Sequence, residues 1–474
     1  METQAADRVF ERRWAVLAAV GVGTFMSALD GSIVNTLLPA LGAAMHASVA
    51  GVEWVATVYL LVVSGVLLVV GRLGDMRGHK EVYVAGFAGF VAASALCGLA
   101  PSLGWLIAAR ALQALGGAML FANAPAILTQ SFPPSERGRA LGLQAVMTYL
   151  GLSVGPPLGG LLASSLGWRS VFFVNIPVGA FGFWLSQRNI ARDRPASARP
   201  PFDLAGAALF FVGLLSLLLA LNQGHAWGWG SPPVLLLLAG AALFLGAFVA
   251  VERRPEPMLD LSLFRRRVFS GAVASAMVSY VAQFAVLFLL PYYLRWRGLG
   301  PDRAGLVLTA QPLLMMVTAP FFGALSDRLG TRGPVVLGLL LLTGGVLFLS
   351  TVSSATPIAW VVLGMAVCGA GFGAFITPNN SRLLGAAPPE RRGIASGVLA
   401  AARNVGMVLG IGLAGAVLTS TLTRLGPDAI PRGVSAALRL VAALTFLSAV
   451  ASLLEGRGSD ESARLPAVRA RGEG

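Results

Sequence analysis

The chain has 474 residues, of which 56% are hydrophobic and only 12% are charged. A soluble protein usually carries about 25% charged residues, so this composition excludes an ordinary soluble domain and indicates a membrane protein. The net charge of +14 does not indicate nucleic-acid binding, because the basic residues lie in short loops rather than on one compact face.

Apolar runs of about 20 residues predict transmembrane helices. Fourteen such runs follow one another along the chain, at 14–39, 52–71, 81–99, 104–130, 138–163, 170–187, 203–222, 233–251, 269–294, 303–325, 334–352, 358–380, 393–420 and 433–454. We therefore expect an all-α membrane protein, embedded in the lipid bilayer. An even number of spans places both termini on the same side.

The basic residues predict which side that is. Of the 35 Lys and Arg residues, 26 fall in the tails and loops on the side of the termini, six on the opposite side and three within spans. Basic residues are enriched in cytoplasmic loops. We expect a multi-pass protein of the cell inner membrane, with both termini cytoplasmic.

The spans group into two sets of six with two more between them. We expect an N-terminal six-helix bundle over 1–190 and a linker with the two extra helices over 191–268. A C-terminal six-helix bundle over 269–455 and a cytoplasmic tail over 456–474 complete the predicted organisation.

A charged loop occurs twice, after the second and after the tenth span. Gly71–Lys80 (GRLGDMRGHK) and Gly323–Arg332 (GALSDRLGTR) align at one offset of 252 residues. Such repeats characterise transporters whose substrate path lies between two related units. We expect these loops to latch the two halves and to hold the outward-facing state, through Gly71, Asp75, Arg77, Gly78, Asp327 and Arg328.

Asp30 is the most informative single residue. It lies about 24 Å along the first helix from Trp14, at 1.5 Å per residue. Acids inside a membrane usually mark ion or proton pathways, and loss of water favours the neutral form of a carboxyl group. Arg110 lies at a similar depth, about 21 Å from the inner side. We interpret both as proton-coupling residues; substrate charge recognition or a structural role are the alternatives.

Small residues form a stripe in the fifth span. Gly151, Gly155 and Gly159 recur at intervals of four residues, which allows close helix packing in lipid. Gly160 follows, and Pro156 with its neighbour Pro157 removes backbone donors and predicts a kink. The stripe predicts either ordinary packing or a gate that closes one end of the cavity.

Several segments resemble a known family. The loop G-x-L-x-D-x-x-G resembles the signature loop of the major facilitator superfamily. LIAARALQALGGA (106–118) and GLSVGPPLGG (151–160) are similar to motifs of its drug:proton antiporters. LDGSIVNTLLP (29–39) and GWRSVFFVNIPVG (167–179) resemble segments of the fourteen-helix EmrB/QacA-like antiporters. The resemblance implies two six-helix bundles plus two extra central helices, and a role for Arg110 in proton transfer.

The resulting functional hypothesis is a proton-coupled multidrug efflux antiporter that exports small amphipathic or lipophilic compounds by alternating access. The proton gradient would supply the energy; no cofactor or metal is expected, and we expect a monomer. An apolar cavity suits broad specificity. Its expected lining is Phe25, Tyr59, Gln113, Tyr149, Tyr280, Phe284 and Arg403, although Arg403 would equally serve to join helices.

This hypothesis has three alternatives. The same machinery could export one endogenous metabolite, siderophore or lipid. A membrane-embedded enzyme would need paired carboxylates for a metal-diphosphate, and no such pair occurs inside a span. An ATP-driven pump is disfavoured because the G-x-x-x-x-G-K-[ST] motif is absent.

Overall fold

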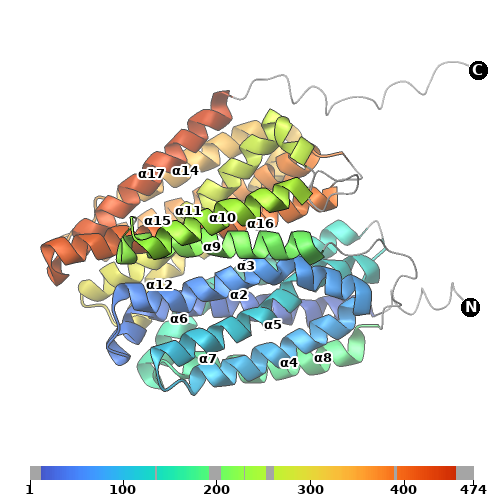
Figure 1. Cartoon of the computed structure of the whole chain (residues 1–474), viewed down its shortest axis with the longest axis horizontal. Coiled ribbons are helices and arrows are strands. Elements are labelled where there is room, and N and C mark those ends of the chain that lie inside the picture. The colour runs from blue at the N-terminus through green and yellow to red at the C-terminus, as the bar shows by residue number, and fades with distance from the viewer. Residues whose placement is uncertain are drawn as a thin grey trace, which may run out of the picture.

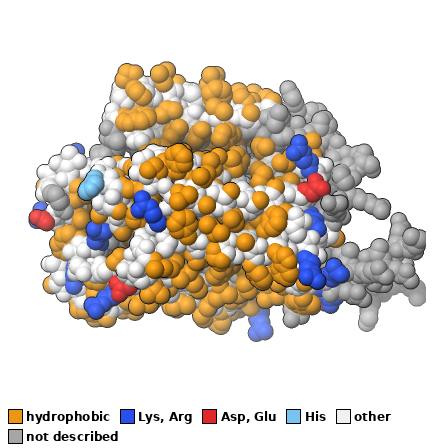
Figure 2. All heavy atoms as spheres, turned by 90° about the horizontal axis from the view of Figure 1, so that it is seen from below, with side chains coloured by type: hydrophobic (Ala, Val, Ile, Leu, Met, Phe, Trp, Pro, Cys, Tyr) orange, Lys and Arg blue, Asp and Glu red, His pale blue; other side chains and the backbone are white. Residues whose placement is uncertain are grey.

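The computed structural model describes residues 12–133, 136–191, 204–228, 230–251, 261–388 and 392–454. Every regular element in these ranges is a helix. Hydrophobic side chains cover the middle of the face seen in Figure 2, and charged side chains gather toward its two ends. This is the surface of a protein that spans a bilayer.

The helices follow the predicted spans in order. The first half comprises α2 (Arg13–Ala44), α3 (Val49–Arg77), α4 (His79–Gly98), α5 (Leu103–Ser131), α6 (Arg137–Ser165), α7 (Ser170–Phe173) and α8 (Asn175–Asn189). Then come α9 (Leu204–Trp227), α10 (Pro232–Val251) and the short η1 (Leu261–Arg265). The second half comprises α11 (Arg267–Trp296), α12 (Pro301–Leu308), α13 (Ala310–Leu329), α14 (Arg332–Leu349), α15 (Ile358–Gly385), α16 (Arg392–Leu425), η3 (Pro427–Ala429) and α17 (Ile430–Leu454).

The predicted fold class is confirmed. In the described residues, thirteen segments are long and apolar enough to cross a membrane, and the remaining predicted span lies in α9. The helices extend beyond several predicted spans: α3 runs from Val49 to Arg77, whereas the hydropathy pattern predicts 52–71. The polar ends continue the helix past the apolar run.

Both halves use the same packing scheme. In the first half α2 packs on α6, while α5 packs on α3 and α4. In the second half α11 packs on α16, while α15 packs on α13 and α14. Figure 1 shows the halves side by side, from blue to cyan and from yellow to red. The repeat in the sequence is therefore a repeat in the structure.

The two extra helices lie beside the junction of the halves, not inside it. Helix α9 packs against α3 of the first half and α16 of the second, and α10 packs on α9 (Figure 1). Leu214 of α9 joins Leu61 and Val408 in a small cluster at this junction. The extra helices are thus central in sequence and peripheral in space.

The repeated loops share a backbone conformation. Gly78 ends α3 with φ 106°, and its counterpart Gly330 ends α13 with φ 85°. L side chains rarely adopt such positive φ values, which explains glycine at both positions. The side chains of Asp75 and Asp327 lie outside the described part of the structure, so the latch stays a prediction.

The hydrophobic cores show where the halves meet. One core is shared by both halves and includes Leu37 of α2, Leu289 of α11 and Leu418 of α16. Toward the ends of the helices that carry the chain termini, the halves have separate clusters, around Phe132 in one and Phe269 in the other. The two halves are therefore joined at the end remote from the termini.

Candidate functional site

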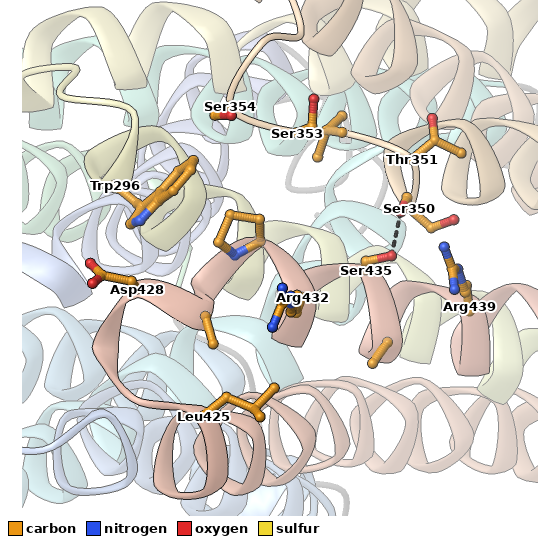
Figure 3. A pocket seen from close by; sticks show the side chains of 14 residues that line it. Trp296, Ser350, Thr351, Ser353, Ser354, Leu425, Asp428, Arg432, Ser435 and Arg439 are labelled. Carbon is orange, nitrogen blue, oxygen red and sulfur yellow. Dashed lines mark hydrogen bonds between the residues drawn. The ribbon is translucent and has the colours of Figure 1, made fainter.

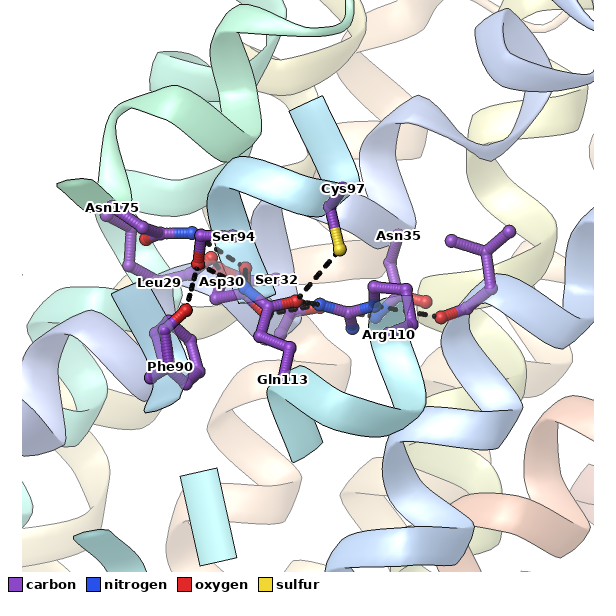
Figure 4. A network of polar contacts seen from close by, with 12 residues as sticks. Leu29, Asp30, Ser32, Asn35, Phe90, Ser94, Cys97, Arg110, Gln113 and Asn175 are labelled. Carbon is purple, nitrogen blue, oxygen red and sulfur yellow. Dashed lines mark hydrogen bonds and ion pairs between the residues drawn. The ribbon is translucent and has the colours of Figure 1, made fainter. Parts of the chain in front are cut away.

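Asp30 and Arg110 form an ion pair inside the first half. The Nη1 of Arg110 lies 2.5 Å from Oδ2 of Asp30, and the side chains are 1% and 0% exposed (Figure 4). The Nε of the same guanidinium donates to the carbonyl of Val55, at 3.0 Å. Arg110 therefore links α5 to both α2 and α3.

Two amides complete the surroundings of the carboxylate. Gln113 and Asn175 donate to Oδ1 of Asp30, at 3.0 Å and 2.8 Å. The amide nitrogen of Gln113 also donates to Oγ of Ser94, at 2.8 Å. The carboxylate of α2 is thus held by side chains from α5 and α8, and through Gln113 it is connected to α4.

Tyr59 closes this cluster from α3. The guanidinium carbon of Arg110 lies 4.3 Å from the centre of the Tyr59 ring. The sequence predicts that Tyr59 and Gln113 line a substrate cavity. Both are almost fully buried, so in this conformation they support the ion pair and present no open surface.

The cluster is sensitive to the loss of any one charge. Removing one partner of a buried ion pair leaves the other without compensation, at a cost of about 3–5 kcal/mol. Protonation of Asp30 is such a removal. It would release Arg110 from α2 and so loosen a cluster to which α2, α3, α4, α5 and α8 contribute.

Asn175 and Ser94 belong to the cluster but were not predicted from the sequence. Asn175 begins α8 and lies within the segment GWRSVFFVNIPVG, whose resemblance was noted without a role for the asparagine. A polar amide in an apolar span was the available signal, because such groups usually bond across helices. Ser94 gave no signal beyond its polarity.

The glycine stripe of α6 joins two different surfaces. Gly151 and Gly155 face α2 so closely that a Cβ would overlap the carbonyl of Phe25 and the side chain of Ser32, respectively. A Cβ at Gly160 would overlap the carbonyl of Pro301 in α12, across the junction. The reverse contact is equally close: a Cβ at Gly305 of α12 would overlap the carbonyl of Pro156 of α6. Helix α6 runs through both prolines, and Gly159 packs on Ile33 of α2.

The second copy of the stripe repeats this arrangement. Gly406 and Gly410 face the backbone of α11, as Gly151 and Gly155 face α2. Gly415, the counterpart of Gly160, lies against the carboxylate of Glu53 across the junction. Glu53 is 4% exposed and was not singled out from the sequence. Both stripes therefore join the halves at the end remote from the termini.

Tyr149, Tyr280 and Arg403, three of the remaining cavity candidates, lie where the halves meet. Phe25, Tyr149, Tyr280, Phe284 and Arg403 are all partly exposed. Arg403 of α16 lies close to the hydroxyls of Tyr149 of α6 and Tyr280 of α11. The Tyr280 ring packs edge-on against Phe372, with 5.1 Å between the ring centres. These residues bring both halves to one place.

Two cavities lie elsewhere. One of about 760 Å³ is lined by Trp296, Arg432 and Arg439 (Figure 3). The other, of about 460 Å³, is lined by His46 and Tyr292 among others. None of the predicted cavity residues lines either one.

The gating-loop residues lie at the opposite end. Arg77 and Arg328 are exposed at the last turns of α3 and α13. Gly71 is partly exposed within α3. The described parts of these loops fix the turn geometry, and their contacts across the junction stay a prediction.

Comparisons with known proteins agree with this architecture. The model of the Major Facilitator Superfamily matches residues 20–410 and, in a second match, 269–471. The riboflavin transporter RibZ of Clostridioides difficile is 32% identical over 414 residues, covering 87% of this chain and 90% of the relative. The multidrug resistance protein Stp of Mycobacterium tuberculosis is 35% identical over 431 residues, with 89% and 80% covered.

A solved structure shows the same fold. The peptide transporter POT, in complex with sulfate, superposes with a TM-score of 0.70 at 15% identity, covering 92% of this chain and 93% of that one. The family predicted from the motifs is thereby confirmed, and the enzyme alternative is excluded. The chain belongs to the Major Facilitator Superfamily and is a multi-pass membrane transporter of small molecules.

Proposed function

We propose that this transporter is a proton-coupled exporter of small amphipathic compounds across the cytoplasmic membrane. The observation that carries the proposal is the fully buried Asp30, bound by Arg110, Gln113 and Asn175. A carboxylate in such a place is costly, and within membranes such groups usually serve ion or proton transfer. The proton gradient is the energy source, and no cofactor takes part.

The coupling step follows from the geometry of the cluster. A proton on Asp30 neutralises the charge that Arg110 compensates, and the freed guanidinium must then find another partner. Because Arg110 also bonds the carbonyl of Val55, its movement changes the contact of α5 with α3. Proton binding thus biases the arrangement of helices that carry one wall of the junction.

The proposed orientation of the chain in the membrane determines which side this conformation faces. The excess of basic residues on the side of the termini supports a cytoplasmic position for both ends. Since the halves share a core at the opposite end, this conformation is closed outside and faces the cytoplasm. In this state Asp30 has released its proton and pairs with Arg110, and the transporter can bind substrate from the cytoplasm.

The substrate range is either broad or limited to one metabolite. Similarity to the multidrug resistance protein Stp supports the export of several compounds. Similarity to the riboflavin transporter RibZ supports a transporter dedicated to one metabolite. The partly exposed aromatic residues at the junction suit flat substrates in either case. We propose a monomer, since each half finds its packing partners within the chain.

Transport into inverted membrane vesicles tests the proposal. Vesicles that hold the full-length protein are energised to acidify their interior, and uptake of rhodamine 6G, fluorescein and riboflavin is measured with and without a protonophore. We expect uptake that the protonophore abolishes. Uptake of riboflavin alone would favour the dedicated transporter, and uptake that ignores the protonophore would contradict proton coupling. Proteolysis of terminal tags in intact cells tests the orientation, since cleavage from outside would contradict it.

A further inference from the structure

Arg403 lies at the middle of the membrane in α16. At 1.5 Å per residue, Tyr149, Tyr280 and Arg403 lie about 16–20 Å along their helices from the ends nearest the chain termini. The three residues come from α6, α11 and α16, so both halves contribute. All three residues are partly exposed in this conformation.

In the described part of the chain, no acidic side chain forms an ion pair with Arg403. Among the described residues, the ion pairs recorded are Arg13 with Glu136 and Arg110 with Asp30. Asp30 is 0% exposed and bound by three donors within the first half. Helix α16 carries no acid at all. The partners of Arg403 are the neutral hydroxyls of Tyr149 and Tyr280.

Asn404, the neighbour of Arg403 in the chain, has an unsatisfied hydrogen-bond donor. Asn404 is 5% exposed, and its amide nitrogen has no hydrogen-bond acceptor within the described part of the chain. Buried polar groups are usually satisfied, so an exception needs an explanation. The guanidinium of Arg403 offers donors only, and the amide nitrogen of Asn404 is a further donor without an acceptor. An acceptor with negative charge would compensate the guanidinium of Arg403.

We propose that Arg403, Tyr149 and Tyr280 form an anion-selective substrate subsite, which takes flat aromatic compounds with a carboxylate, phenolate or similar oxyanion. This inference rests on the proposed export function and narrows its substrate class. The oxyanion forms charge-assisted hydrogen bonds with the guanidinium. The aromatic body packs against Tyr280, whose ring Phe372 holds in place. A cationic compound is disfavoured, because it would face an uncompensated positive charge.

Two dyes with one skeleton and opposite charge test the subsite. Fluorescein is an anion at mildly alkaline pH, whereas rhodamine 6G is a cation with the same tricyclic ring system. Equilibrium binding of each is measured by fluorescence polarisation to the purified full-length transporter, without any proton gradient. We expect fluorescein to bind the wild type at least about tenfold more tightly than rhodamine 6G.

Three variants make the result specific. Arg403→Gln should weaken fluorescein binding about tenfold or more and leave rhodamine 6G unchanged or bound more tightly. Arg403→Lys keeps the charge and should retain part of the preference. Arg439→Gln is the matched control, because it removes an arginine of the second half that lines the separate cavity of Figure 3. Gel filtration confirms that each variant is folded.

Several results would overturn the proposal. These are a preference of the wild type for rhodamine 6G, equal weakening of both dyes by Arg403→Gln, or binding of neither dye to folded protein. The outcome is independent of proton coupling. Fluorescein binding that depends on Arg403, combined with uptake that ignores a protonophore, would keep the subsite and reject the proposed coupling.

Discussion

Replacing Gly160 by alanine should open the end of the molecule at which the halves are joined. The added methyl group would overlap the carbonyl of Pro301 in α12, and backbone cannot move aside as a flexible side chain can. Overpacking of this kind costs about 1–3 kcal/mol. The cost falls only on the joined state, because the two surfaces separate when that end opens.

That cost predicts a measurable shift in population. A difference of about 1–3 kcal/mol changes a two-state equilibrium by roughly five- to 150-fold. Gly142→Ala is the matched control, since it lies on the same helix and a Cβ there meets nothing within 4 Å. It adds the same methyl group without touching the other half.

Spin labels at the ends of α6 and α16 report the change. Leu166→Cys and Leu425→Cys place one label on each half, at side chains that are 72% and 55% exposed. The native Cys97 and Cys368 are buried and stay unlabelled. We expect longer distances in Gly160→Ala and wild-type distances in Gly142→Ala. Identical distributions in both variants and the wild type would refute the reasoning.

Three further predictions concern stability, measured as thermal unfolding in detergent. Asp30→Asn should cost about 3–5 kcal/mol by leaving Arg110 uncompensated, and Asp30→Asn with Arg110→Gln should recover part of it; no recovery would contradict the pairing. Asn175→Leu removes a donor to a carboxylate and should cost about 1.5–3 kcal/mol, whereas Asn189→Leu, which removes a donor to the carbonyl of Leu185 in its own helix, should cost about 0.5–1.5 kcal/mol. Gly78→Ala should cost about 1–2 kcal/mol because of its positive φ, and wild-type stability would contradict the strained turn.

The fold was largely predictable from the sequence. Apolar runs located the helices because a bilayer demands that each span satisfy its own backbone hydrogen bonds. The positions of α9 and α10 beside the junction were not predictable. Both helices are apolar all round, so no polar face indicates which side turns toward the protein.

The site was predictable where distance along a helix decides depth. The regular rise of a helix placed Asp30 and Arg110 at one depth, and the structure brings them into contact. Asn175 was not predicted because its contact with Asp30 depends on how α8 packs, and residue spacing does not encode that packing. Glu53 was not predicted because a single acid near the start of an apolar run gives no periodic signal. The roles of all these residues in transport stay predictions.

The central claim is that Asp30 carries the coupled proton, and transport by Asp30→Asn in proteoliposomes tests it most directly. Two modes are compared at equal amounts of folded protein: accumulation of fluorescein driven by a pH gradient, and exchange of fluorescein at equal pH. The dye is quantified after filtration and lysis at one fixed pH. We predict that Asp30→Asn loses gradient-driven accumulation and retains exchange. Accumulation by Asp30→Asn equal to that of the wild type would contradict the account.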